Sequence, residues 1–358
     1  MAQSEAFTQT SANLKGHYRQ LMRRRLSGLV LLVLLILVSI TSDVLLGSSR
    51  MDIGQLYAAV FQYSGESGNM SEFIVWKLRI PAALIAVAVG LGLGLAGAEM
   101  QTILNNPLAS PFTLGVSSAA AFGAALAMIL QISIPGIPGH WIVSANAFLF
   151  ALGSALLLDA VARWGGMNTT GIVLFGIALV FSFNALVSLM QYVASADALQ
   201  ELVFWTMGRL TELDEVWLKV GILLIAFAVI LPWSVANSWR LTAMRLGEDR
   251  ATSYGVNVSR VRLESLLRIS ILSALSVAFV GTIAFVGLVA PHIARRIFGE
   301  DHRFYLPGSA LMGALILSLA SIVSKNLVLG AIVPVGIVTA LVGVPFFLLI
   351  VLRSKRFS

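Results

Sequence analysis

The sequence predicts an all-α polytopic membrane protein with about ten transmembrane segments, one of them short. Of its 358 residues, 58% are hydrophobic and only 11% are charged, and the mean hydropathy is +0.89. So few charged side chains cannot cover a soluble globule of this length, whereas apolar runs long enough to cross a bilayer recur along the chain. The absence of cysteine excludes a disulfide framework, a thiolate metal site and a cysteine nucleophile.

The apolar runs define the predicted elements. The first run, residues 26–47, is longer than the apolar core of a signal peptide and lacks a convincing cleavage site, so we expect it to remain as a spanning helix. A short run at 290–298 is not expected to cross alone. The other runs have spanning length and lie at 82–104, 113–131, 141–162, 171–193, 216–236, 266–289, 306–329 and 332–352.

The distribution of Lys and Arg predicts the orientation. Alternating the segments across the membrane places 18 cations on the side of the N-terminus and 6 on the other. By the positive-inside rule, both termini and the polar segment 240–268 are cytoplasmic. The domains are then a basic cytoplasmic segment (1–26), one transmembrane domain (27–352) and a cytoplasmic tail (353–358). Cationic flanks on an anionic inner leaflet explain the net charge of +7 without nucleic acid.

Motifs for chemistry are missing. No Gly-Lys dipeptide occurs, so a Walker A loop is excluded and any ATP hydrolysis must come from a partner. The GxGxxG string at 92–97 lies inside a spanning helix and is not a dinucleotide motif. The four histidines lack the spacing of metal ligands, so neither a metal site nor catalysis by this chain is expected.

Two features of the helices leave alternatives open. Ala86, Gly90, Gly94 and Ala98 form a stripe of small residues, which favours close packing inside the chain over a subunit interface. Glu99 is the one clear ionisable residue inside the predicted spans. We favour an interfacial or hydrogen-bonded carboxylate over a proton-coupling site, because a proton-driven carrier needs a deeper relay.

The segment 240–268 carries six arginines between two membrane-length runs. Its pattern predicts a short amphipathic helix with Ala243, Leu246 and Ala251 on one face, ended by Gly255, and a second short helix from Asn257. The result is a cytoplasmic knob with an apolar face. The alternative is a basic loop that lies on lipid headgroups.

This segment resembles the coupling-helix region of permease subunits of ABC importers for iron-siderophores, haem and cobalamin, a family of type II (FecCD-type) importers. The similar residues are LGEDRA (246–251) with Gly255 and Val256. The resemblance covers nearly the whole chain in order, through VWKLRIP (75–81), GAEMQTILNNPLASPFTLGV (97–116), AFVGLVAPHIAR (284–295), LPGSALMGA (306–314) and PVGIVTALVGVPFF (334–347).

The resemblance implies a type II ABC importer permease fold with ten membrane segments, in a homodimer or a close heterodimer of permease subunits. Two copies of a cytoplasmic ATPase, which uses ATP and Mg, would dock on the knob, and an extracytoplasmic binding protein would deliver the substrate. The chain itself would bind no cofactor. Coupling to the ATPase is then expected of Arg245, Leu246, Gly247, Glu248, Ala251 and Gly255.

The resemblance also implies three further sites. The turn Asn168, Thr169 and Thr170 corresponds to a cytoplasmic gate, although these residues could equally cap the next helix. On that helix a polar stripe would line the translocation path, or alternatively form bonds between helices. The stripe consists of Asn184, Ser188 and Gln191.

Docking of the binding protein is expected at Arg79 and Lys325, whose alternative role is snorkelling to the interface. The chain departs from the family pattern at Ala82, where a second arginine is common, and at Ile332, where glutamate is usual. Lys325 in place of arginine also loses bidentate pairing with a carboxylate. These departures predict weaker docking electrostatics, or a heterodimeric partner that supplies the missing charges.

The predicted function is import of a preassembled chelate across a bacterial inner membrane. A path of small uncharged residues suits a bulky chelate better than a bare metal ion, which needs fixed ligands. A ferric siderophore is the first expectation, with cobalamin and haem as alternatives. An ion-coupled secondary carrier would leave the knob without a role and is less favoured.

Overall fold

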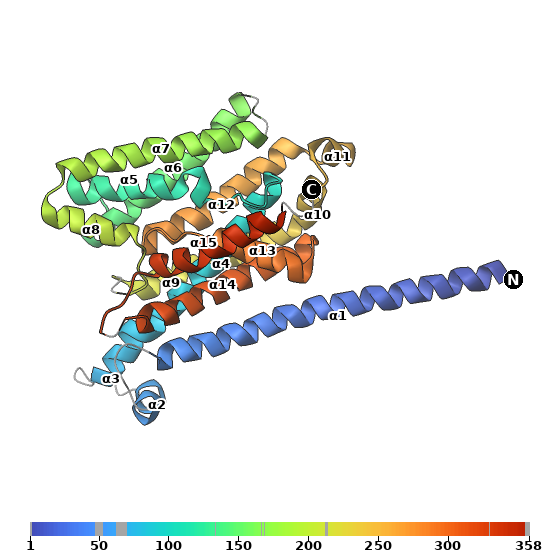
Figure 1. Cartoon of the computed structure of the whole chain (residues 1–358), viewed down its shortest axis with the longest axis horizontal. Coiled ribbons are helices and arrows are strands. Elements are labelled where there is room, and N and C mark those ends of the chain that lie inside the picture. The colour runs from blue at the N-terminus through green and yellow to red at the C-terminus, as the bar shows by residue number, and fades with distance from the viewer. Residues whose placement is uncertain are drawn as a thin grey trace.

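A computed structural model of the chain shows a bundle of helices (Figure 1). It describes residues 2–46, 53–61, 70–132, 134–165, 167, 169–211, 214–328 and 330–354, and within them forms no strand beyond one bridge between Val328 and Ala331. Seven helices in this part of the chain are long and apolar enough to cross a membrane. They are α1 (Ala2–Leu45), α3 (Met70–Phe73) continued through a π-helix (Ile74–Arg79) into α4 (Ile80–Ile103), α6 (Ile142–Trp164), α7 (Thr169–Val193), α9 (Val216–Ala236), α12 (Val258–Val280) and α14 (His302–Asn326).

Shorter helices complete the fold. Two apolar ones, α5 (Val116–Ile129) and α15 (Val335–Ser354), correspond to predicted segments, as does α13 (Val286–Phe298). The others were not predicted as separate helices within their regions: α2 (Ile53–Phe61), α8 (Ala196–Thr206), α10 (Ser238–Met244) and α11 (Glu248–Ser253). Each predicted apolar run therefore has a helix, and the all-α polytopic fold is confirmed.

One predicted boundary is wrong. The runs 266–289 and 290–298 are divided at residues 281–285 instead, where Gly281 has φ of +76° and Phe285 of +67°. The region around this break forms hydrogen bonds with the end of α8 and the residues after it: Arg209 N–H donates to Val280 O (2.8 Å) and the Thr282 side chain donates through Oγ1 to Thr206 O (2.5 Å). Because the residues of the break are mostly apolar, hydropathy alone placed the boundary too late.

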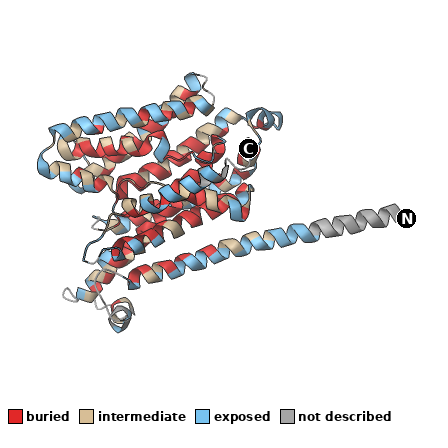
Figure 2. Ribbon diagram, in the orientation of Figure 1, coloured by how far each residue is buried: buried red, intermediate tan, exposed pale blue. Residues whose placement is uncertain are grey.

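α4 lies at the centre of the molecule and is buried along most of its length (Figure 2). A Cβ on Gly90 would lie 2.5 Å from Gly313 O, and one on Gly94 would lie 2.3 Å from Ser309 O. The backbones of α4 and α14 are thus in direct contact, which only glycine allows. The stripe of small residues packs inside the chain, as the sequence indicated.

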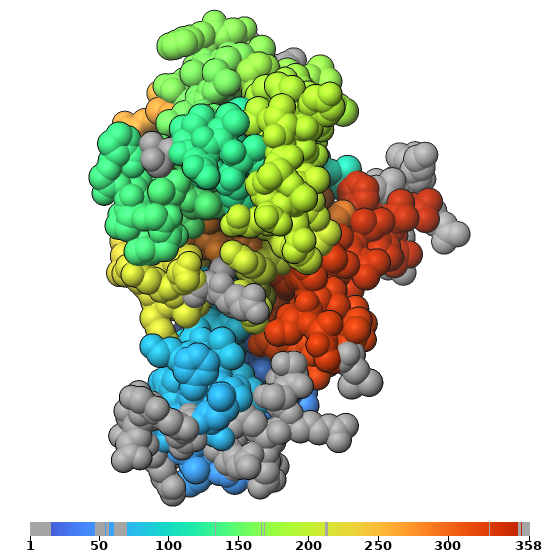
Figure 3. Space-filling view, turned by 90° about the vertical axis from the view of Figure 1, so that its left-hand side faces the viewer, coloured from blue at the N-terminus to red at the C-terminus, as the bar shows by residue number. Residues whose placement is uncertain are grey.

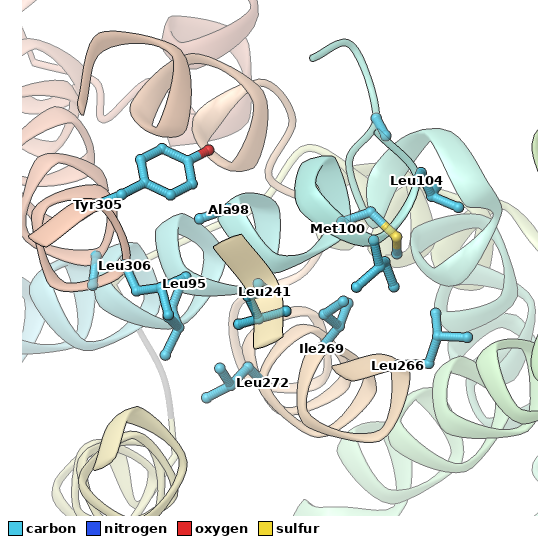
Figure 4. Close-up of a cluster of buried hydrophobic side chains, with 14 of the residues drawn as sticks. Leu95, Ala98, Met100, Leu104, Leu241, Leu266, Ile269, Leu272, Tyr305 and Leu306 are labelled. Atoms are coloured by element: carbon cyan, nitrogen blue, oxygen red, sulfur yellow. The ribbon is translucent and has the colours of Figure 1, made fainter. Parts of the chain in front are cut away.

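The helices form two sides around this centre. In Figure 1, α5, α6, α7 and α8 lie on one side of α12, and α4, α13, α14 and α15 lie on the other, with α1 along the outer edge. The core on the second side joins side chains of four helices (Figure 4). They are Leu95, Ala98 and Met100 of α4, Leu241 of α10, Ile269 and Leu272 of α12, and Tyr305 and Leu306 of α14.

The two ends of the bundle differ. α10, α11, the beginning of α1 and the end of α15 lie at one end, and α3, α8 and the α14–α15 connection lie at the other, which Figure 3 faces. The start of α1 and the end of α15 therefore lie on the same side as α11. That this side is the cytoplasmic one stays a prediction of the charge distribution.

Candidate functional site

The coupling segment, residues 240–268, forms the end of α10, the short helix α11 and the start of α12. The predicted continuous helix through Ala243 and Ala251 is wrong, because Gly247 has φ of +101° and starts a new helix. Gly255, with φ of +80°, does follow the end of α11. Asn257 caps a helix by accepting a bond from Arg260 N–H (3.0 Å), but this helix is the 23-residue α12 and not a second short one.

α11 presents one side to the bundle and one to solvent. Ala251 is fully buried, and Val256 after the helix is buried too. Leu246 is 50% exposed and Tyr254 is 61% exposed, and a Cβ on Gly247 would meet nothing within 4 Å. Two exposed apolar side chains and an open glycine thus remain available to a partner.

Arg245 faces the chain itself. Its guanidinium donates two bonds to Glu300, of 3.2 and 3.1 Å, and one to Asn105 Oδ1, of 2.8 Å. These contacts join the linker before α11 to the end of α4 and to the turn between α13 and α14. In this structure Arg245 positions α11 and leaves little of its charge for an ATPase.

The candidate gate touches the coupling segment directly. Thr169 Oγ1, at the start of α7, donates to Glu248 Oε1, at the start of α11 (3.2 Å). Arg262 Nη2 on α12 donates to the same oxygen. Glu248, 79 residues beyond Thr169 in the sequence, therefore links α7, α11 and α12.

A cavity of about 400 Å³ lies beside this contact. Thr169, Thr170 and Val173 line one side, and Leu104, Asn105 and Asn106, after the end of α4, line the other. Asn168, the third predicted gate residue, lies outside the described residues, as does its alternative role as a helix cap. The two threonines face a space that they could open or close.

The predicted path residues lie on α7. Asn184 and Ser188 are exposed and Gln191 is half-buried, whereas Ile172, Gly176, Leu179 and Val187 of the same helix are buried against the bundle. No hydrogen bond joins the three polar side chains to another helix within the described part of the chain. The alternative of bonds between helices of this chain is therefore not supported.

The two predicted docking cations are not surface charges. Lys325 Nζ donates to Asp43 Oδ2 on α1 (2.8 Å), and both side chains are buried. Arg79 is also buried and donates to Val44 O, in the last turn of α1 (2.8 Å). Both cations therefore bind α1 in this structure, and docking of a binding protein at Arg79 and Lys325 stays a prediction. Ala82, another of the departures, is buried in α4, so arginine there would not have been a surface charge in this fold.

A larger cavity of about 820 Å³ opens at the end shown in Figure 3. It lies between α8 and the α14–α15 connection. Its lining includes Asp197, Glu201, Arg209 and Ile332, together with part of Lys325. The end of the molecule opposite α11 therefore has a hollow with charges of both signs.

Comparison with known families places these features. Residues 31–353 match the model of the FecCD transport family. The chain belongs to the FecCD transport family. It is 35% identical to the hemin transport system permease protein HmuU of Yersinia pestis, over 93% of this chain and 97% of that protein. It is 34% identical to the vitamin B12 import system permease protein BtuC of Yersinia enterocolitica, over 96% of each.

A solved structure of a metal-chelate type ABC transporter in an inward-facing conformation has the same fold. Its TM-score to this FecCD chain is 0.77, with 30% identical residues, over 91% of this chain and 98% of that one. The chain is thus an ABC importer permease with many membrane segments. Both relatives are named as permease proteins of transport systems.

Sequence reasoning missed one part of this FecCD permease. Arg268 counted as a cytoplasmic cation, but it is fully buried in α12 and pairs with Glu99 on α4. The interpretation of Glu99 as a hydrogen-bonded carboxylate is confirmed, and the side chain is buried. The signal was available, because Arg268 lies inside the predicted run 266–289. The side of the N-terminus still carries the excess of Lys and Arg when Arg268 is left out of the count.

Proposed function

We propose that this chain is the permease subunit of an ATP-driven importer that moves a ferric siderophore from an extracytoplasmic binding protein into the cytoplasm. The observation that carries the proposal is the contact between Thr169 and Glu248. It connects α11, which is flanked by the exposed apolar side chains of Leu246 and Tyr254, to α7, which lines the gate cavity. Such a connection is what an importer driven by an external ATPase needs.

The ATPase is the partner proposed for α11. Leu246 and Tyr254 supply the apolar contact, and Gly247 admits a partner side chain closely. We propose two copies of this ATPase, which would use ATP and Mg. Hydrolysis is assigned to the partner because this sequence has no Walker A loop.

A second permease subunit is proposed for the exposed face of α7. Asn184 and Ser188 lie on this face, and a spanning helix exposes such groups more favourably to a watery path than to lipid. Two such faces, from a homodimer or a heterodimer, would enclose the path. Binding protein would then dock at the opposite end, where the larger cavity opens.

The substrate is proposed as a chelate because the path residues are small or uncharged. HmuU is named for hemin and BtuC for vitamin B12, so haem and cobalamin are the alternatives to a ferric siderophore. Both are large preassembled molecules, as a ferric siderophore is. The excess of cations that the sequence gives to the side of α11 supports the proposal that α11 and both termini face the cytoplasm of a bacterium, with the chain in its inner membrane.

The experiment is reconstitution of the complete complex with its ATPase and binding protein in proteoliposomes. A ferric hydroxamate, haemin and cyanocobalamin are each loaded on the binding protein, and stimulation of ATP hydrolysis and uptake are measured. We expect the ferric chelate to be imported only with ATP. Import of haemin or cyanocobalamin instead would reassign the substrate, and uptake by the permease alone, driven by an ion gradient, would show a secondary carrier.

A further inference from the structure

A buried ion pair joins three helices near the coupling segment. Arg268 on α12 donates to both oxygens of Glu99 on α4, with Nε–Oε1 and Nε–Oε2 distances of 3.0 Å and an Nη2–Oε2 distance of 2.8 Å. Both side chains are 1% exposed. Because an isolated charge is costly inside a membrane protein, each partner fixes the position of the other.

The end of α9 takes part in the same cluster. Ser234 Oγ donates to Glu99 Oε1, and the Trp233 ring lies under the guanidinium of Arg268, 4.9 Å from its central carbon. Ser265 Oγ accepts a further bond from Arg268 Nη2 (2.9 Å). The remaining nitrogen, Nη1, is buried without a hydrogen bond in the described part of the chain.

The position of this cluster in the chain is informative. α9 ends at Ala236, two residues after Ser234, and α10 and α11 follow before α12 begins at Val258. The helices on both sides of the segment that carries α10 and α11, namely α9 and α12, are therefore attached to the Glu99 carboxylate on α4. α4 in turn ends at Ile103, beside the gate cavity lined by Leu104 and Asn105.

The geometry suits transmission of force better than it suits stability. A buried ion pair is a weak source of stability compared with apolar side chains of similar size, but it strongly disfavours other arrangements of the helices that carry it. Two bonds from one planar guanidinium also restrict rotation between α4 and α12. Sliding of α9 or α12 along α4 would separate charges in an apolar environment.

We propose that Glu99 and Arg268 are positioning residues for coupled transport. They hold α9 and α12, the helices on either side of the α10–α11 segment, to α4. A displacement of α11 then moves the inner end of α4 and the gate cavity with it. Without the pair, α9 and α12 absorb the displacement. This inference rests on the proposed function, because it requires a partner that moves α11.

The test compares ATP hydrolysed with substrate imported in the reconstituted complex, using whichever of ferric hydroxamate, haemin or cyanocobalamin the unaltered complex imports. We expect Glu99→Gln and Arg268→Met to keep ATP hydrolysis but raise the ATP used per molecule imported about tenfold, equivalent to about 1.4 kcal/mol of lost coupling. Arg268→Lys, which keeps the charge without the planar fork, should restore part of the coupling.

Asp159→Asn is the matched control. Asp159, near the C-terminal end of α6, is also a buried carboxylate, but it pairs with Arg163 of its own helix and forms no ion pair with another helix in the described part of the chain. We expect this variant to keep the ratio of the unaltered complex. Ser234→Ala keeps the ion pair and the Trp233 contact and removes only the hydrogen bond from α9 to the charged carboxylate, so it should raise the ratio about fivefold.

The outcomes separate the two proposals. An unchanged ratio in Glu99→Gln, Arg268→Met and Ser234→Ala, while the unaltered complex imports substrate with ATP, overturns the positioning role alone. If the two charge variants fail to assemble, Ser234→Ala decides, because it leaves the ion pair in place. Absence of ATP-driven import by the unaltered complex overturns the proposed function and, with it, this inference.

Discussion

At the residue scale, Gly247 is the most informative position in the coupling segment. Its backbone has φ of +101°, and open space surrounds the site of a Cβ. We predict that Gly247→Arg gives a membrane-inserted permease that does not bind the ATPase, because the added side chain occupies the docking space. Co-purification of the ATPase from mild detergent measures this, at equal permease level.

The control for this variant is Gly247→Ala. Alanine carries the same unfavourable φ with little volume, so it reports the cost of the backbone conformation alone. We expect Gly247→Ala to keep most ATPase binding. Equal loss in both variants would show that backbone strain and not volume is responsible, and full binding by Gly247→Arg would contradict the docking site.

Gly97 tests the packing at the centre of the bundle. A Cβ there would lie 1.8 Å from Gly287 O, so Gly97→Ala must separate α4 from α13. We predict a loss of about 1–3 kcal/mol in the free energy of unfolding, the usual cost of overpacking. Unfolding in detergent measures it, with Gly153→Ala as control, because a Cβ on Gly153 meets nothing within 4 Å.

Some residue roles followed from sequence patterns and others did not. The four-residue spacing of Gly90 and Gly94 predicted the close approach of helices, because spacing alone determines which residues share a face. The partners of Lys325 and Arg268 could not be predicted. Both lie more than 160 residues from the carboxylates they bind, and only the folded bundle brings them together.

At the scale of elements, the contact between α7 and α11 connects the gate and the coupling segment. We predict that Glu248→Gln and Thr169→Val each reduce import, since each weakens the same bond, and that the double variant is no worse than Glu248→Gln. Uptake by the reconstituted complex gives this double-mutant cycle. Strictly additive losses would show that the two residues act independently.

Asp301 connects α1 and α14 and makes this connection sensitive to acid. It caps α14 and forms ion pairs with Arg25 of α1 (3.1 Å) and with Arg303 (2.8 Å). The hydrogen bond from Arg303 is the largest cause that holds the pKa of Asp301 below its ordinary value of 3.8, and burial opposes it.

Because the folded-state pKa is lowered, the stabilisation by Asp301 is present above the ordinary pKa and is lost as the pH falls through the folded value. We predict that hydrogen exchange of residues 16–25 in the unaltered protein becomes faster below about pH 4, beyond the intrinsic effect of pH on exchange. In Asp301→Asn this step of the pH profile is missing. An identical pH profile in both proteins would contradict the role of Asp301.

The existence of the elements was easier to predict than their boundaries. Length and hydropathy identified each apolar run that became a helix. The break at Gly281–Phe285 and the division of α10 from α11 depend on backbone angles. The break also depends on hydrogen bonds with distant residues, such as the one that Arg209 N–H donates to Val280 O. The hydropathy of a local stretch of sequence reports neither backbone angles nor long-range hydrogen bonds.

At the scale of the whole molecule, the composition and the charge distribution were sufficient for the fold class and for a consistent topology. The start of α1 and the end of α15 lie at the end of the bundle that carries α11 (Figure 1), as the predicted alternation of the segments requires. The docking of a binding protein was less predictable. A sequence shows that Arg79 and Lys325 are cations, but not that α1 covers them.

The central claim is that an external ATPase, acting on α11, drives import through this permease. The most direct measurement is uptake of substrate from the loaded binding protein into proteoliposomes that contain the permease with or without the ATPase. We predict uptake only when the ATPase and ATP are both present, and its loss in Gly247→Arg. Uptake by the permease without the ATPase, driven by an ion gradient, would contradict the account.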